Sequence, residues 1–128
     1  ITFINDSKAT NLSSTEVALN NYKNIHWILG GLAKAKDRII VSKFKKSILR
    51  AYIIGKNINF FLKQIKSTVK HNTSHTLKNA LLSALRESKN YPSLKQVILL
   101  SPSAASFDQY KNFEHRGNTF KQLVKKYS

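Results

Sequence analysis

Hydrophobic and polar residues alternate along this chain with two different periods. Short apolar runs bounded by glycine, proline or polar clusters are typical of buried strands. Apolar residues spaced three and four apart are typical of amphipathic helices. The predicted strands are Ile1–Ile4, Ile25–Leu29, Leu49–Ile54, Thr68–Asn72 and Gln96–Leu100. The predicted helices are Ser13–Tyr22, Arg38–Ser47, Ile58–Ile65, Thr76–Ser88 and Asn118–Tyr127.

The order of these elements predicts the fold class. Strand and helix alternate five times, and the chain contains no internal repeat or low-complexity linker. Such alternation predicts an α/β, three-layer Rossmann-like domain, with a mostly parallel sheet of about five strands and helices on both faces. The 128 residues suit a single domain spanning 1–128. Within the first helix, Ser13 and Glu16 have the spacing of a capping box and so predict where the helix begins.

One long polar stretch lies between the last predicted strand and the last predicted helix. Residues Ser101–Gly117 are rich in hydroxyls, carboxamides and charges, and they include two phenylalanines and a tyrosine. Loops longer than about 12–15 residues are usually functional or disordered, and aromatic residues argue against disorder. We therefore expect an ordered binding loop. In an open parallel sheet it shares the carboxyl-terminal edge with the loops Asn5–Asn11 and Gly30–Asp37.

The net charge of +16 leaves two interpretations open. It favours a polyanionic partner, and thus a basic nucleic-acid-binding α/β module. However, lysine outnumbers arginine 18 to 4 and is spread along the chain, whereas specific base and phosphate contacts favour arginine. The other interpretation is a lysine-rich surface without a nucleic-acid partner. The absence of cysteine excludes a disulfide framework and thiolate metal sites, and no apolar run approaches the ~20 residues of a membrane helix.

Several loop residues have the chemistry to bind an anion or a sugar. Lys8 precedes a predicted helix, whose N-terminal amides and partial positive charge favour anions; otherwise it is a solvated surface lysine. Asp6 can orient Lys8, accept a hydrogen bond from a sugar hydroxyl, or cap the turn. In the last loop, Ser103 and Ser106 can donate to a carboxylate or phosphate, or bond to their own backbone.

Other patterns predict less. Glu114 and Arg116 are expected to form a structural ion pair. His71-x-x-x-His75 has the spacing of two metal ligands without a third, and the pair is expected to lie across a strand–helix boundary. No phosphate-binding loop, dinucleotide fingerprint or nucleophile elbow occurs. Spacing alone therefore predicts an α/β domain with an anion-binding edge and no catalytic machinery.

Taken together, three of the loops resemble a known family. Their sequences are Asn5-Asp6-Ser7-Lys8-Ala9-Thr10-Asn11, Ile28-Leu29-Gly30-Gly31-x-x-Lys34-x-x-Asp37 and Leu99-Leu100-Ser101-Pro102-x-Ala104-Ala105-Ser106-Phe107-Asp108-Gln109-Tyr110-x-Asn112-Phe113-Glu114-x-Arg116-Gly117. In order and spacing they resemble the C-terminal domain of the UDP-N-acetylmuramoyl-L-alanine:D-glutamate ligases, within the Mur ligase family. The chain departs from the family pattern at Leu12, Leu32 and Ser103, and none of these changes removes a group expected to touch substrate.

The resemblance implies a three-domain, ATP-dependent, amide-bond-forming ligase of peptidoglycan precursor synthesis in the bacterial cytoplasm. This enzyme would add D-glutamate to UDP-N-acetylmuramoyl-L-alanine through an acyl phosphate. An N-terminal domain would bind the uridine nucleotide, and a central domain would hold most of the ATP and Mg²⁺. The present domain would bring D-glutamate and close over ATP. Alone, it is expected to be inactive, with no catalytic residue or metal site of its own, and Ile1 is expected to be a fragment boundary.

The resemblance also implies roles for individual residues. Lys8 would bind one carboxylate of D-glutamate, while the Ser106 hydroxyl and the Phe113 backbone N–H would bind the other. Asp6 would lie on the nucleotide side of the cleft. The expected partners are D-glutamate, UDP-N-acetylmuramoyl-L-alanine and the enzyme's own N-terminal and central domains, with no membrane and no specific nucleic acid. The rival interpretations are the nucleic-acid-binding module and a stand-alone nucleotide-binding protein.

Overall fold

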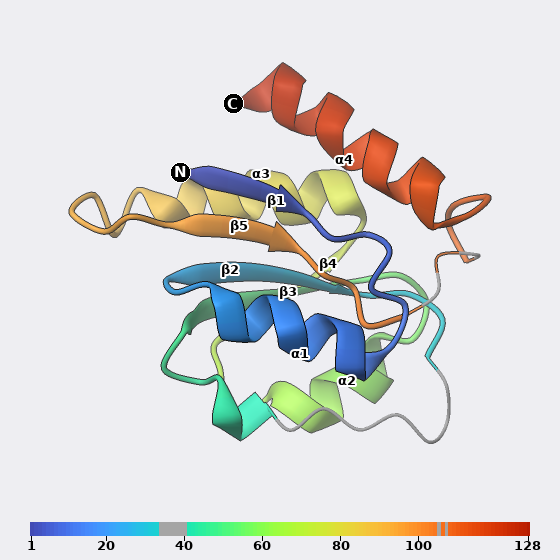
Figure 1. The fold of residues 1–128 in the computed structure, drawn as a ribbon, viewed down its shortest axis with the longest axis horizontal. Helices are drawn as coiled ribbons and strands as arrows, with labels where there is room; N and C mark the ends of the chain where they lie inside the picture. Colours follow the sequence, from blue (N-terminus) through green and yellow to red (C-terminus); the bar gives the residue numbers. More distant parts are fainter. Residues whose placement is uncertain (34–40, 105, 107) are drawn as a thin grey trace.

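The computed structural model describes residues 1–33, 41–104, 106 and 108–128. In this part of the chain, five strands form one parallel sheet in the order β1-β5-β2-β3-β4 (Figure 1). The strands are β1 Thr2–Asn5, β2 Ile25–Gly30, β3 Ile48–Ile54, β4 His71–His75 and β5 Val97–Leu100. The helices are α1 Leu12–Asn21, α2 Ile58–Ile65, α3 Leu77–Ser88 and α4 Phe113–Tyr127, with a short 3-10 helix η1 at Val41–Lys43.

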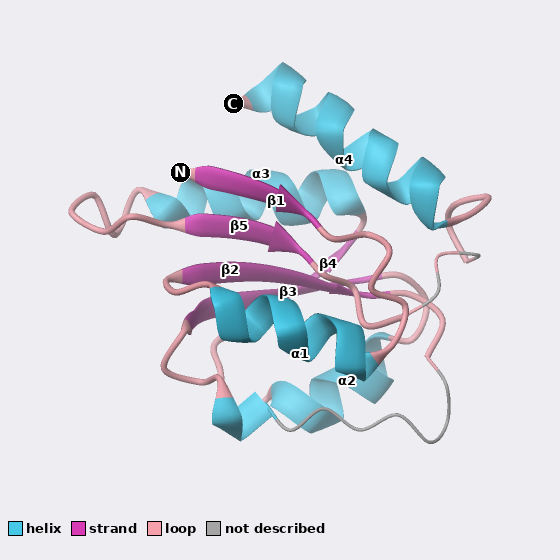
Figure 2. Cartoon of the chain, in the orientation of Figure 1, coloured by secondary structure: helices cyan, strands magenta, loops and turns pink. Residues whose placement is uncertain are grey.

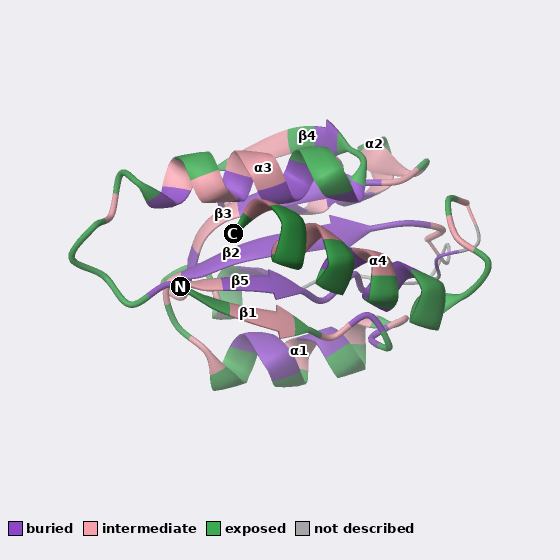
Figure 3. Ribbon diagram, turned by 90° about the horizontal axis from the view of Figure 1, so that it is seen from above, coloured by how far each residue is buried: buried purple, intermediate pink, exposed green. Residues whose placement is uncertain are grey.

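Helices cover both faces of the sheet. Helices α1 and α2 lie on one face, and α3 and α4 lie on the other (Figure 2). Each face has its own apolar core: Trp27, Ile53 and Phe61 belong to the first, and Tyr52 and Leu81 belong to the second. Burial follows the central strands and the inward sides of the helices (Figure 3). The predicted three-layer α/β fold is confirmed.

The fourth strand lies later in the chain than predicted. It runs from His71 to His75 rather than from Thr68 to Asn72, and its pairing with β3 begins at Ala51 opposite His71. The reason is that the backbone after α2 first completes a turn, with the amides of Thr68 and Val69 donating to the Ile65 carbonyl. Both histidines therefore belong to β4, at its two ends, and the prediction that they lie across a strand–helix boundary was wrong.

The first helix begins at Leu12, with Asn11 as its N-cap. The Asn11 side chain accepts a hydrogen bond from the Ser14 amide at 3.0 Å. The predicted capping box at Ser13 and Glu16 is therefore wrong, because asparagine caps helices as well as serine does and stands two residues earlier. This earlier start packs Leu12 against the core.

The last helix begins at Phe113 rather than at Asn118, so the loop that precedes it is shorter than predicted. Asn112 is the N-cap, and its side chain accepts from the His115 amide at 2.7 Å. The added turn has no apolar periodicity, because Phe113 is exposed and Gly117 is a poor helix former. Gly117 packs against Asn5 and Ser7, where a Cβ would lie 3.0 to 3.2 Å from their side chains.

The predicted helix Arg38–Ser47 is described only from Val41 onward. There the backbone forms η1 and a following turn, in which the Ser47 amide donates to the Phe44 carbonyl at 2.8 Å. The α-helix predicted for this stretch is therefore wrong from Val41 to Ser47, and residues 38–40 lie outside the described part of the chain.

Candidate functional site

The loops after β1 and β5 lie side by side at the carboxyl-terminal edge of the sheet (Figure 1). The two strands are parallel neighbours, so both chains leave the sheet in the same direction. The Asp6 amide donates to the Leu100 carbonyl at 2.7 Å, and the Ser103 amide donates to the Ala9 carbonyl at 2.9 Å. Residues from the two ends of the sequence are thereby brought to one place.

Asp6 is anchored to the core of the domain. Its Oδ2 accepts from the Ser101 hydroxyl at 2.8 Å, and the Ser101 Oγ lies 3.1 Å from the Thr15 Oγ1. The Ser101 carbonyl accepts from the buried indole Nε1 of Trp27 at 2.8 Å. The Asp6 carbonyl also accepts from the Ala9 amide at 3.0 Å, which closes the turn. The backbone of Asp6 thus closes the turn, whereas its carboxylate is held by Ser101 in a fixed orientation beside the loop and does not cap the turn.

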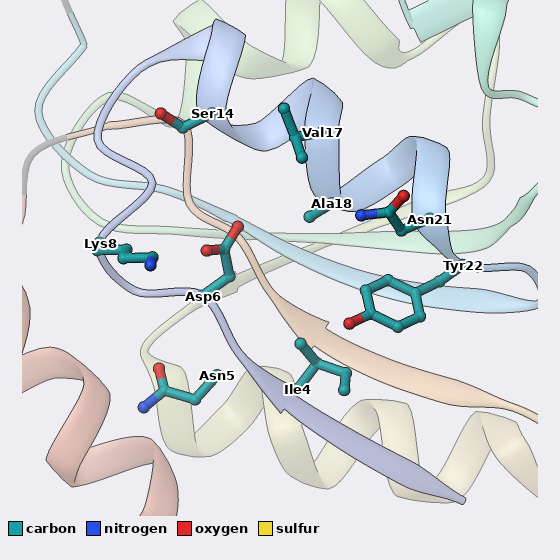
Figure 4. Close-up of a pocket in the computed structure, with 9 residues that line it drawn as sticks. All are labelled: Ile4, Asn5, Asp6, Lys8, Ser14, Val17, Ala18, Asn21 and Tyr22. Carbon is teal, nitrogen blue, oxygen red and sulfur yellow. The ribbon is translucent and has the colours of Figure 1, made fainter.

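A pocket of about 560 Å³ lies between β1 and α1, with Asp6 and Lys8 at one end (Figure 4). The Lys8 side chain extends toward Asp6 in this view. Val17, Ala18 and Tyr22 supply apolar surface at the other end. The pocket thus combines a carboxylate, an ammonium group and an apolar wall.

A second, smaller groove of about 280 Å³ brings Lys8 together with Phe113. It lies between the β1–α1 loop and the first turns of α4, and Lys121 also lines it. The first amides of a helix have no intrahelical partner and carry partial positive charge. Glu114 lines the groove as well. Two lysines and a helix N-terminus thus outweigh one carboxylate, and this balance favours anions.

Ser106 lies in the β5–α4 loop and is 2% exposed. Its carbonyl accepts from the amides of Gln109 and Tyr110 at 3.1 and 2.8 Å, which makes a tight turn. Ser106 lines neither of the two pockets that include Lys8. The structure therefore brings Lys8 and Phe113 into one groove, while the predicted convergence of Lys8 and Ser106 on a single ligand stays a prediction.

Arg116, on the first turn of α4, connects these loops and was not predicted to do so. The side chain is 1% exposed, and its guanidinium donates to Ser7 Oγ, Ser7 O and Ala104 O at 2.9, 2.7 and 3.0 Å. The Ser7 hydroxyl in turn donates to the Phe113 carbonyl at 2.6 Å. The predicted Glu114–Arg116 ion pair is therefore wrong: among the described residues, the salt bridge is between Arg50 and Glu87.

Burial has a measurable consequence for Arg116. Removal of water from the guanidinium lowers the pKa of Arg116 to about 10, although the nearby Asp108 and Tyr110 act in the opposite direction. The group therefore remains protonated at neutral pH. It places a positive charge against Ser7, which lines the same groove as Lys8 and Lys121.

The β5–α4 loop also reaches the loops on the far side of the sheet. The Asp108 carboxylate accepts from the Lys56 amide at 2.8 Å, and the Gln109 side chain donates to the His75 carbonyl at 2.9 Å. Gly55, with a φ of +85°, allows the close approach of Asp108, since a Cβ there would lie 2.5 Å from the Asp108 Oδ2 and 2.8 Å from the backbone of Gly31. The described residues of this loop are thus held on both sides, and residues 105 and 107 lie outside the described part of the chain. Lys34 and Asp37 of the glycine-rich motif lie outside the described residues.

Other candidate chemistry finds less support. The described residues contain no group of three or more His, Cys, Asp or Glu side chains that could hold a metal ion, so the pair His71 and His75 has no third ligand among them. Within the same residues, no helix has both the length and the apolar character needed to cross a membrane. The positive charge is distributed over several elements, including Lys63, Lys66 and Lys70 near α2.

Comparison with known proteins gives close relatives for this chain. No family model matches it. The UDP-N-acetylmuramoylalanine–D-glutamate ligase of Nitrobacter winogradskyi is 40% identical over 124 residues, which are 97% of this chain and 27% of that protein. The proteins of the same name from Bradyrhizobium diazoefficiens and Cereibacter sphaeroides are 41% and 42% identical, over 97% and 98% of this chain. The chain spans about a quarter of the length of these relatives.

Proposed function

Because this chain is homologous to the C-terminal domain of the UDP-N-acetylmuramoylalanine–D-glutamate ligases, we propose that it is the D-glutamate-binding domain of such an enzyme. The complete ligase would join D-glutamate to UDP-N-acetylmuramoyl-L-alanine through an acyl phosphate, at the expense of ATP. Its other two domains would supply the uridine-nucleotide and ATP sites, and the reaction would take place in the cytoplasm. Alone, this domain would be inactive.

The observation that carries the proposal is that Lys8 and Phe113, from opposite ends of the sequence, line one groove at the start of α4. D-Glutamate has two carboxylates, and a binding site must replace the water around both. Each hydrogen bond to a charged group contributes roughly 1.5–3 kcal/mol, so an ammonium group and a few oriented donors suffice. Lys8 would bind one carboxylate, and the Ser106 hydroxyl and the Phe113 amide would bind the other.

The role of this domain would be to position the substrate. The D-glutamate amine must be held, with a free electron pair, against the activated carboxyl carbon of the L-alanine residue. Two fixed carboxylates leave the amine little rotational freedom, and such orientation is a large part of the rate enhancement of bimolecular reactions. Closure of the domain would then bring the amine to the acyl phosphate and exclude water.

Asp6 would lie on the nucleotide side of the same cleft. Its carboxylate is fixed by Ser101 and lies in the pocket of Figure 4, where α1 supplies apolar surface beside it. A carboxylate next to an apolar wall suits a ribose hydroxyl and a base. The described residues of this chain do not form a metal site and the sequence has no phosphate-binding loop, so ATP phosphates and Mg²⁺ would be held mainly by the central domain.

Substitution of Lys8 tests the proposal. In the complete ligase, Lys8→Ala should raise the KM for D-glutamate roughly 10- to 150-fold, which corresponds to one lost hydrogen bond to a charged group. The KM for ATP should change little. Lys23→Ala is the matched control, because Lys23 is an exposed lysine just before β2, at the opposite edge of the sheet. An unchanged KM for D-glutamate in Lys8→Ala would remove Lys8 from the site.

A further inference from the structure

We propose that Arg116 is a positioning residue for the D-glutamate site: its guanidinium holds the segments that carry Lys8, Ser106 and Phe113 in their relative places. The identity of the ligand rests on the proposed function above. The arrangement of the three segments does not depend on that identity, and it can be tested separately.

The contacts of Arg116 reach each segment close to its predicted binding residue. Two of its nitrogens bond to Ser7, which directly precedes Lys8, and a third bonds to the carbonyl of Ala104, two residues before Ser106. The Ser7 hydroxyl, which accepts from Arg116, donates in turn to the Phe113 carbonyl at 2.6 Å. One side chain therefore links the β1–α1 loop, the β5–α4 loop and the first residue of α4.

Stability alone does not account for a buried arginine at this position. Among the described residues, no carboxylate lies within ion-pair distance of the Arg116 guanidinium. A buried charge without a direct ion-pair partner is costly, and apolar side chains of similar volume are often at least as stabilising. What the guanidinium provides, and an apolar side chain cannot, is a planar set of donors that fixes several oxygens in one geometry.

Substitution of Arg116 by lysine separates the effect of the guanidinium's shape from that of its charge. Lysine keeps the positive charge but presents one compact ammonium group, which cannot reach three oxygens along the directions of the guanidinium fork. If positioning is the role, Arg116→Lys should therefore behave nearly as badly as the uncharged Arg116→Met. If the charge alone matters, Arg116→Lys should behave like the wild type.

Amide hydrogen exchange of the 128-residue chain, measured by NMR, tests the arrangement without any ligand. In Arg116→Lys, exchange of the Ala9 and Ser103 amides should accelerate by about tenfold or more, because their hydrogen bonds close the β1–α1 turn and join it to the β5–α4 loop. Amides of Trp27 and Leu81, one in each of the two cores, should keep their rates. Arg86→Lys, an exposed arginine at the end of α3, is the matched control and should change neither pair.

Steady-state kinetics of the complete ligase test the consequence. Arg116→Lys should lower kcat/KM for D-glutamate roughly 10- to 100-fold, the effect expected of a misplacement near 1 Å, mainly through KM, while the KM for ATP stays within about twofold. Ser7→Ala removes the hydroxyl that links Arg116 to Phe113 and should give a smaller change in the same direction. It also serves as the test variant if Arg116→Lys fails to fold.

Three results would overturn the proposal: exchange that is unchanged at Ala9 and Ser103, exchange that rises uniformly over the chain, or a lower kcat at an unchanged KM for D-glutamate. The last two describe a residue that only stabilises the fold. A wild-type ligase that does not turn over D-glutamate would refute the proposed function instead, and the exchange experiment would still decide the role of Arg116.

Discussion

Acidification should destabilise this fold through one buried histidine. His26 lies on β2 and is fully buried. The Gln96 side chain donates its Nε2 protons to the carbonyls of Ser88 and Tyr91 at 3.0 and 2.8 Å, so its Oε1 faces the His26 Nε2 at 2.7 Å. The Nε2 of His26 must therefore carry the proton. Its Nδ1 is then the acceptor for the Tyr52 hydroxyl at 3.0 Å.

A second proton on His26 is disfavoured in the folded state. Burial lowers the pKa of His26 from its ordinary value of 6.5, and the hydrogen bond to Gln96 and the charge of Glu87 oppose this only in part. Below pH 6.5 the unfolded chain binds a proton at His26 that the native state does not bind. The contribution of neutral His26 to the free energy of unfolding is thus fully present above pH 6.5. It is lost as the pH falls below 6.5, and the free energy of unfolding then decreases by up to about 1.4 kcal/mol per pH unit.

Urea denaturation between pH 8 and pH 5, followed by the fluorescence of the buried Trp27, measures this loss. His26→Gln is the reference, because glutamine keeps an N–H for Gln96 but binds no proton in this range. The variant should be less stable than the wild type at pH 8. The difference in the free energy of unfolding should shrink as the pH falls, because only the wild type loses the contribution of a neutral His26. All other titrating groups are shared by the two proteins, so their effects cancel in the comparison. A constant difference from pH 8 to pH 5 would refute the assignment of a neutral, buried His26.

Two further pairs of substitutions test a strained glycine and a helix cap near the site edge, each by chemical denaturation. Gly30→Ala should destabilise the domain by at least roughly 1–3 kcal/mol, because Gly30 has a φ of +125° and a Cβ there would collide with the carbonyl of Ile54. Gly117→Ala, in a helix, should lower the free energy of unfolding by less. Equal losses in the two variants would contradict the strain at Gly30. Asn11→Ala should cost about 0.5–2 kcal/mol as a lost helix cap, whereas Ser13→Ala should stay within about 0.5 kcal/mol; the reverse ranking would restore the capping box.

The parts of the fold that bury a regular apolar face are the parts that the sequence predicts. Ile58–Ile65 and Thr76–Ser88 match α2 and α3 closely, because their apolar spacing is dictated by packing against the sheet. The continuous apolar run Ile25–Leu29 likewise marks the central strand β2, which is buried along its whole length. Parallel order then follows from the alternation of strand and helix.

Elements without such a face are misplaced from sequence. Strand β4 has the sequence His-Asn-Thr-Ser-His and lies at an edge of the sheet, so no apolar residue marks it. The first turn of α4 exposes Phe113 and contains Gly117, and neither residue indicates a helix. An asparagine cap shifts the start of α1 without changing the apolar pattern.

The candidate site is predictable only in part, for a related reason. Chain order shows that Asp6, Lys8 and Ser106 follow strands, but it does not show that β1 and β5 are neighbours in the sheet. The role of Arg116 is even harder to predict from the sequence. Its partners are a hydroxyl and two carbonyls from distant segments, and no residue type in those segments indicates an arginine partner. The resemblance of the loops to a known family implies D-glutamate as the ligand, and the packing around Arg116 follows only from the three-dimensional structure.

Lys8 and Ser106 are proposed to converge on one small dianion beside the Phe113 amide. A crystal structure of the complete ligase that carries this chain, with D-glutamate bound, tests it most directly. We expect the Lys8 ammonium group within hydrogen-bond distance of one carboxylate, and the Ser106 hydroxyl and the Phe113 N–H on the other. D-Glutamate bound elsewhere, or bound with Lys8 and Ser106 turned away from it, would contradict the account.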